Sequence, residues 1–355
     1  MNPNINELCK DHLFQLNLAI WLAQPQPPSE FYVYPIFYES QLNIYSIGPL
    51  LTLPPDIRLA VTEKINYQDA VRPDLILATA EKKKFCVLEC KSSSFGPESS
   101  NVNQATTLLL IAGPVISEVL AIGKRGENEC ILCYLIGSNG AKAMEETLKT
   151  LEKEIKDKTS LESGNSDCFG IKPSPSAIVL EYSEKIKNFL NLIKDSPVEV
   201  IQIEEDTDPR PLYFIPYDPN IQTKEEQELS RRILFERILG HIISRIGGAD
   251  IPSSITFTTE ELLNSATFGV YEIWEDNEAK KHLRRLVKDF LNNIMHFISE
   301  PLKGFITYEP QKGWSFNLKD REACEEILKQ IQKFKPETLD LSKKIEPNLF
   351  DNMED

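Results

Sequence analysis

The chain has 355 residues, with 39 basic and 54 acidic side chains and a formal net charge of −15. Lys and Arg must neutralise phosphates when a protein binds nucleic acid, so this balance excludes a generally basic, non-specific nucleic-acid-binding protein. The composition, 41% hydrophobic and 26% charged, is that of a globular protein, and the length predicts two or three domains.

The absence of targeting and membrane-spanning segments predicts where the protein is located in the cell. No apolar run approaches the roughly 20 residues that span a bilayer, and the segment 1–4 lacks the basic and apolar parts of a signal peptide. Seven cysteines, an odd number, lie mostly in apolar segments typical of a reduced core. We therefore expect a cytoplasmic protein with no membrane partner. Cys130 and Cys133 have half of a zinc-site spacing, but they would point to opposite faces of a strand, so no zinc is expected.

Apolar periodicity predicts the elements of the first half of the chain. A helix comes first, followed by two strands joined by a tight charged turn, a second helix and a buried strand. In chain order these elements occupy residues 5–23, 72–77, 85–91, 100–123 and 130–137.

Three charged residues converge in this predicted hairpin. Side chains alternate along a strand, so Glu89 and Lys91 share one face and Cys90 points to the other. Asp74 begins the preceding strand, where pairing would bring it near Glu89. Two neighbouring carboxylates repel each other and favour a cation, and Mg²⁺ suits a site with one or two carboxylates. With Lys91 to orient or help deprotonate a water, these parts suffice for phosphodiester hydrolysis.

Pro73-Asp74 followed, after a gap of fourteen residues, by Glu89-Cys90-Lys91 resembles the motif of the PD-(D/E)xK nuclease superfamily. The resemblance covers roughly residues 5–137 and implies a restriction-endonuclease-like αβββαβ core with a mixed sheet. It also implies that Asp74 and Glu89 bind Mg²⁺, or Mn²⁺ in its place, with help from the Cys90 carbonyl, and that Lys91 assists the water. Gln104 resembles the helix glutamine of RecB-like and Mrr-like members, which faces the metal site.

Each of these features has a simpler alternative. The hairpin could be a solvated one that carries a surface ion pair, and Gln104 could lie on an exposed helix face. Glu7 and Glu63 are further candidates for the metal, the first from a helix and the second from a preceding strand. Ser92 is a candidate phosphate contact, although loop serines are common.

The second half of the chain is predicted to contain two regions of different secondary structure. A charged helix at 145–158 precedes a predicted loop at 159–175, a strand-helix-strand unit and a proline-rich boundary. From 223 onward, helices are followed by a two-stranded hairpin, which resembles a winged-helix domain in architecture. The expected organisation is a nuclease domain, an extension with a linker, a mainly helical winged-helix-like domain and an acidic tail: 1–158, 159–222, 223–335 and 336–355.

A basic cluster lies on the predicted helix 278–298, just before the hairpin. Helical spacing places most of its members on one side: Lys280, Lys281, Arg284, Arg285 and Lys288. In winged-helix domains such a helix reads the major groove, so the cluster is a candidate nucleic-acid contact. A solvated helix face and a protein-docking surface are the alternatives.

The sequence therefore predicts a Mg²⁺-dependent endonuclease that acts on DNA rather than RNA. The resemblance suggests an effector of restriction or antiviral defence that works with a protein partner, or a homodimer, since a double-strand cut needs two active sites. Two alternatives remain open. One is a repair or recombination nuclease specific for junctions or single strands. The other is a non-catalytic nucleic-acid-binding or assembly subunit, against which the complete Asp, Glu and Lys set argues.

Overall fold

The computed structural model describes residues 5–25, 32–202, 208–218, 223–297, 306–309 and 313–333. The predicted acidic tail, 336–355, and part of the proline-rich boundary lie outside these residues. The chain forms two compact units. The first comprises residues 1–222 together with 270–280, and the second comprises 223–269 together with 281–355. The segment 159–222 thus folds with the first unit.

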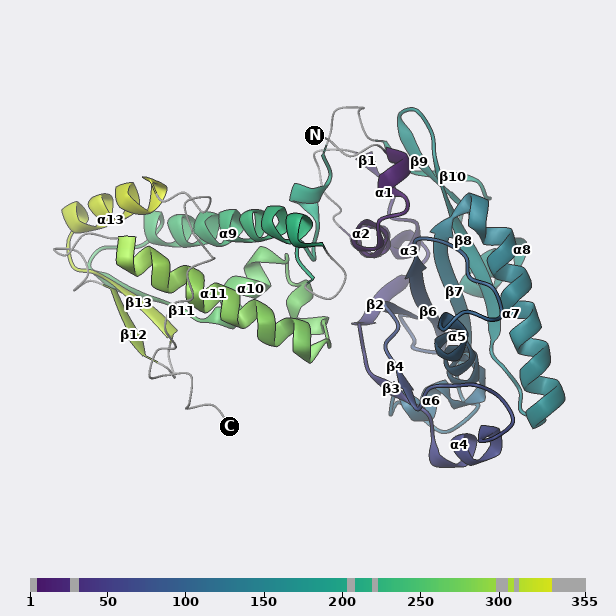
Figure 1. The fold of residues 1–355 in the computed structure, drawn as a ribbon. Helices are drawn as coiled ribbons and strands as arrows, with labels where there is room; N and C mark the ends of the chain where they lie inside the picture. The colour runs from purple at the N-terminus through teal and green to yellow at the C-terminus, as the bar shows by residue number, and fades with distance from the viewer. Residues whose placement is uncertain are drawn as a thin grey trace. The chain divides into compact units, whose positions relative to one another are not determined.

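The first unit is α/β and is built on a mixed eight-stranded sheet, as the sequence predicted at this level (Figure 1). Strand β7 is parallel to both β6 and β8, and the other neighbours are antiparallel. Across the sheet the strands are β1 (Tyr32–Val33), β10 (Val198–Gln202), β9 (Ala177–Glu181), β8 (Asn165–Pro173), β7 (Glu129–Gly137), β6 (Lys84–Lys91), β5 (Leu75–Thr79) and β2 (Leu42–Ile47).

Helices cover both faces of this sheet (Figure 1). One face packs against α2 (His12–Leu22) and α3 (Ile36–Glu39), where the rings of Phe37 and Phe169 lie 5.4 Å apart. The other face shares its core with α5 (Asn101–Leu110), η1 (Ile111–Val115), α6 (Ile116–Val119) and α7 (Ser138–Thr159). The buried central strands are apolar on both sides, as expected for strands with two covered faces.

Smaller elements complete the first unit. They are α1 (Ile5–Leu8), α4 (Pro55–Val61), α8 (Glu184–Leu190), the 3-10 turn η2 (Arg210–Leu212) and the short pair β3 (Leu51–Thr52) and β4 (Ala70–Val71). The predicted helix 5–23 is divided into α1 and α2. Asp11 caps α2, since its side chain accepts a hydrogen bond from the Phe14 amide at 2.6 Å.

The predicted helix 100–123 is also divided, because Gly113 leaves helical geometry before Pro114. The stretch Asn101–Val119 has the length and apolar composition of a membrane span, contrary to the sequence expectation that no such run occurs. Most of this stretch is buried, and its apolar residues belong to the core that α5, η1 and α7 share with the sheet. Packing inside the unit therefore accounts for its composition.

The prediction of a loop at 159–175 is wrong. Most of that segment is β8, which lies inside the sheet between β7 and β9. Its side chains from Ser166 to Ile171 are buried, although the first three letters of the strand, Asn, Ser and Asp, are polar. Asp167 is accommodated because it accepts hydrogen bonds from the Ser183 hydroxyl at 2.6 Å and the Cys168 amide at 2.8 Å.

In its described residues, the second unit combines four helices with a three-stranded antiparallel sheet of order β11-β13-β12. Its elements are α9 (Lys224–Gly247), β11 (Ser253–Phe257), α10 (Thr259–Ala266), most of α11 (Asn277–Phe297), β12 (Ile306–Glu309), β13 (Gly313–Leu318) and α13 (Arg321–Lys333). Phe235 and Phe290 stack at 4.1 Å between α9 and α11. Thr223 and Thr258 cap α9 and α10.

The segment Val270–Lys280 belongs to the first unit, although it interrupts the sequence of the second. It begins with a 3-10 turn, η3 (Val270–Ile273), and then bridges the edge strand β2. The Glu275 amide donates to the Ile47 carbonyl at 2.8 Å, and the Ser46 hydroxyl donates to the Glu275 carboxylate at 2.6 Å. This end of β2 lies beside the start of β5, because the Gly48 amide donates to the Asp74 carbonyl at 3.0 Å.

Candidate active site

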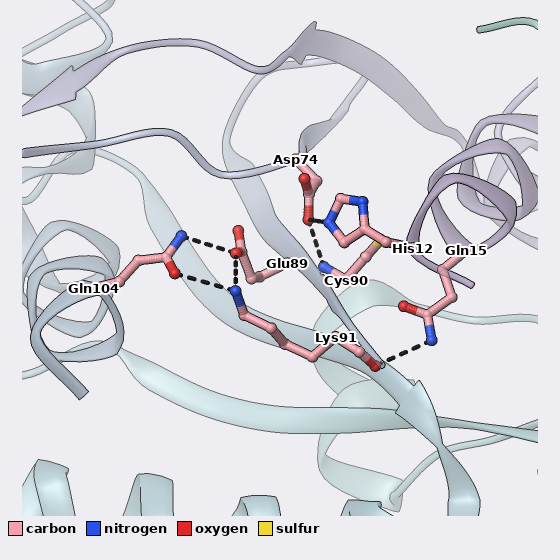
Figure 2. A network of polar contacts seen from close by, with 7 residues as sticks. All are labelled: His12, Gln15, Asp74, Glu89, Cys90, Lys91 and Gln104. Carbon is pink, nitrogen blue, oxygen red and sulfur yellow. Dashed lines mark hydrogen bonds and ion pairs between the residues drawn. The ribbon is translucent and has the colours of Figure 1, made fainter. Parts of the chain in front are cut away.

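Adjacent strands bring the three motif residues together (Figure 2). Leu75 pairs with Leu88 across β5 and β6, so Asp74, one residue earlier, lies opposite Glu89. The Lys91 ammonium lies 2.9 Å from Glu89 Oε1, which agrees with the predicted shared face. These side chains are well shielded, with exposed fractions of 16% for Asp74, 3% for Glu89 and 20% for Lys91. The hairpin is therefore not a solvated one that carries a surface ion pair.

Gln104 reaches the same cluster from α5. Its Nε2 donates to Glu89 Oε1 at 2.8 Å, and its Oε1 accepts from the Lys91 ammonium at 3.2 Å. The amide therefore bridges the two charged partners of the ion pair (Figure 2). Because one hydrogen bond needs a donor and the other an acceptor, a glutamine fits this position where a purely acidic or basic side chain would not.

Asp74 is held from the opposite side of the cluster. Its Oδ2 accepts from the Cys90 amide at 2.6 Å and contacts His12 Nε2 at 3.2 Å. His12, the first residue of α2, was not predicted from the sequence. It lies 62 positions before Asp74, so no local spacing links the two residues. The one sequence signal for its placement is the capping residue Asp11, which fixes where the helix begins.

Burial and neighbouring charges together shift the pKa values of the titratable side chains at this site. Burial, and then the charge of Asp74, raise the pKa of Glu89 to about 7. Burial alone would lower the pKa of His12, but the charge and hydrogen bond of Asp74 outweigh it and raise that pKa to about 9. Burial alone would raise the pKa of Asp74, but the charge and hydrogen bond of His12 outweigh burial, so that pKa is lowered. Burial alone would lower the pKa of Lys91, but the charge and hydrogen bond of Glu89, together with the charge of Asp74, outweigh burial and raise that pKa.

The donor set fits a magnesium ion better than a soft metal. Asp74 and Glu89 each use one carboxylate oxygen in the hydrogen bonds given above. Glu89 Oε2 is buried and has no partner in the part of the chain that the structure describes. Among those residues no group of three or more His, Cys, Asp or Glu side chains is arranged to hold an ion. Mg²⁺ takes one or two carboxylates and keeps several waters, so the two carboxylates and the unused buried oxygen are donors of the kind that would hold it.

Cys90 can contribute to such a site only through its backbone. Its side chain is fully buried, and burial followed by the charges of Asp74 and Glu89 raises the pKa of its thiol. A thiol that keeps its proton is a poor metal ligand. The predicted contribution of its carbonyl oxygen remains a prediction.

The three weaker candidates do not join the cluster. Glu7 is exposed on α1 and Ser92 is exposed after β6, and neither has a side-chain hydrogen bond to the site. Glu63 lies on a turn after α4 with a φ of 65°, and not on the strand expected from the sequence. The helix α4 and its turn occupy the place where that strand was expected.

The predicted basic cluster is only partly available on α11. Lys281 and Arg285 are exposed, and Lys288 is half-buried. Arg284 forms an ion pair with Glu260 at 3.2 Å, and the Lys280 ammonium lies 4.4 Å from the centre of the Tyr271 ring. The sequence missed one neighbour, Arg231 of α9. Burial, Arg231 and Arg285 together lower the pKa of His282, which shows that these basic groups lie close together.

Comparison with protein-family models, with curated proteins and with solved structures found no match.

Proposed function

We propose that this protein is a Mg²⁺-dependent nuclease of the PD-(D/E)xK type that hydrolyses phosphodiester bonds in DNA. The observation that carries the proposal is the cluster of Asp74, Glu89 and Lys91 at the ends of adjacent strands, in which Glu89 is buried and the other two are largely shielded. Its surroundings give further support. The elements α2, β2, β5, β6, α5 and β7 follow one another in the αβββαβ order of that fold, apart from small elements inserted between α2 and β2, between β2 and β5, and between α5 and β7.

In the proposed reaction, Asp74 and Glu89 hold the ion and Lys91 acts on the water. A bound Mg²⁺ would polarise a phosphoryl oxygen and lower the pKa of a water. Since the pKa of Lys91 is raised, its ammonium keeps its proton in the described arrangement. It can therefore orient the attacking water and offset negative charge on the phosphate. Gln104 holds the ammonium near Glu89, and His12 holds Asp74 ionised.

The electrostatics favour a catalytic site over a lapsed one. A carboxylate that is 3% exposed, with a second carboxylate beside it, destabilises the fold unless a cation offsets the charge. A non-catalytic scaffold would have no need of that arrangement, and replacing such groups with apolar residues is often neutral or stabilising. Burial, and then the charge of Asp74, raise the pKa of Glu89 to about 7, so its charged form is costly in this arrangement.

The second unit is proposed to be a winged-helix-like module. The order α9, β11, α10, α11, β12, β13 and the sheet order β11-β13-β12 support this proposal. The exposed Lys281 and Arg285 make contact with nucleic acid the preferred role, and protein docking is the other one. A function in restriction or antiviral defence rests on the family resemblance alone.

A cleavage assay tests the proposal. Supercoiled plasmid, linear duplex, single-stranded DNA and RNA would each be incubated with the protein and Mg²⁺, Mn²⁺ or a chelator. We expect metal-dependent cleavage of at least one DNA substrate and none with Glu89→Gln, which removes a ligand charge at nearly constant volume. Preferential cleavage of branched or single-stranded DNA would select the repair nuclease instead. Cleavage that persists in the chelator or in Glu89→Gln would reject the site.

A further inference from the structure

Helix α2 presents two polar side chains, three residues apart, to the end of β6, the strand that carries Glu89 and Lys91 (Figure 2). His12 contacts Asp74, and Gln15 lies one turn further along on the same side. Gln15 is fully buried. Its Nε2 donates to two backbone carbonyls, that of Lys91 at 3.0 Å and that of Cys9 at 2.8 Å. One amide thus ties the N-terminal segment to the backbone of the lysine.

This contact has an energetic cost that a purely structural amide would avoid. Gln15 Oε1 is buried and makes no hydrogen bond to any residue that the structure describes. An unsatisfied buried acceptor destabilises a fold. Asn17, on the same helix and equally buried, is fully satisfied. It donates to the carbonyls of Leu13 and Ile215, and it accepts from the Ile215 amide.

The position of Lys91 in the sheet explains what the Gln15 contact can do. Lys91 is the last residue of β6, and its pairing with Ile136 is the last of the ladder with β7. The next two residues, Ser92 and Ser93, are exposed and belong to no helix or strand. Strand ends fray unless they are tied down, so the hydrogen bond from Gln15 restrains the point from which the lysine side chain extends.

We propose that Gln15 is a positioning residue, which fixes the Lys91 backbone so that its ammonium stays within reach of Glu89 and Gln104. The expected effect on catalysis rests on the proposed nuclease function. The restraint of the Lys91 backbone does not. Catalysis depends steeply on such placement, since a shift of about 1 Å can slow a reaction by about 100-fold. Gln15 touches no reacting atom, so it acts through Lys91 only.

Gln15→Met and Asn17→Leu form a matched test, since each removes one buried amide from α2 and keeps much of its volume. Two quantities would be measured in the full chain. One is kcat and KM for DNA cleavage, corrected for the folded fraction. The other is amide hydrogen exchange in a peptide that spans 84–96. Gln15→Asn, whose amide is one methylene too short to reach the Lys91 carbonyl, replaces Gln15→Met if that variant does not fold.

We expect Gln15→Met to lower kcat by about tenfold or more with little change in KM, and to accelerate exchange at the end of β6. Asn17→Leu should change neither quantity. Equal losses in both variants, or wild-type kcat and exchange in Gln15→Met, would overturn the proposal. If the wild type cleaves no substrate, the nuclease proposal fails, and the exchange data alone decide whether Gln15 positions Lys91.

Discussion

Glu89 depends on a small number of neighbours for its charge to be tolerated. Both Lys91 and Gln104 donate to its Oε1, while Oε2 has no partner among the described residues. Gln104→Leu would remove one donor to the carboxylate and one acceptor from the lysine. Side chains that orient metal ligands typically change activity by about 10–100-fold when lost, so we expect a decrease of that size in the cleavage rate. Asn103→Ala, at the position before Gln104 in the same helix, should leave the cleavage rate unchanged.

A bound ion should also be visible as stabilisation of the fold. Mg²⁺ at about 100 times its dissociation constant would stabilise the native protein by about 2.7 kcal/mol. In Asp74→Asn, which keeps an acceptor for His12 and the Cys90 amide but loses the charge, we expect little or no such gain. Thermal unfolding at increasing Mg²⁺ measures this, with Asp69→Asn, an exposed aspartate, as the control. An equal Mg²⁺ effect in Asp74→Asn and in the wild type would place the ion elsewhere.

At the residue scale, the sequence predicted the neighbours along the hairpin better than those across the fold. Asp74, Glu89 and Lys91 lie where strand alternation and pairing placed them, and Gln104 faces them from α5. Their catalytic roles remain predictions. His12 and Gln15 were missed because their contacts depend on how α2 packs against β6, which no spacing in the chain encodes.

Among the elements, the approach of η1 to the chain before β8 is especially close. A Cβ atom at Gly164 would lie 2.4 Å from the carbonyl carbon of Ala112. Backbone atoms cannot move away cheaply, so Gly164→Ala should lower the free energy of unfolding by about 1–3 kcal/mol. Gly96→Ala is the control, because a Cβ there meets nothing within 4 Å. Chemical denaturation of both variants would measure the difference, and equal stabilities would show that this approach is looser than described.

Sequence patterns failed for elements whose residues are explained by contacts with other parts of the fold. The segment that forms β8 resembled a linker because its Ser, Asn and Asp residues are polar, yet Asp167 is buried with hydrogen bonds from Ser183 and Cys168. The break at Gly113 was missed because the apolar period continues through it. By contrast, α9, α10 and the hairpin of the second unit carry their own caps and alternation, and they were predicted.

For the whole molecule, a net charge of −15 means that contact with nucleic acid has to be local. The exposed Lys281 and Arg285 are the most direct candidates for phosphate contacts. If both touch phosphates, Lys281→Ala combined with Arg285→Ala should weaken DNA binding at all sequences. The double variant should also reduce the salt slope of the affinity by about two. The control is Lys153→Ala with Lys156→Ala on α7, and an unchanged slope in the α11 variant would favour protein docking.

The proposed activity depends on Lys91 beside two carboxylates. The most direct measurement compares Mg²⁺-dependent plasmid cleavage by the wild type, Lys91→Ala and Lys84→Ala. Lys84 lies at the other end of the same strand, where its ammonium donates to the Phe189 carbonyl at 3.0 Å. We expect cleavage by the wild type and Lys84→Ala and none by folded Lys91→Ala. Cleavage by Lys91→Ala at the wild-type rate would contradict this expectation.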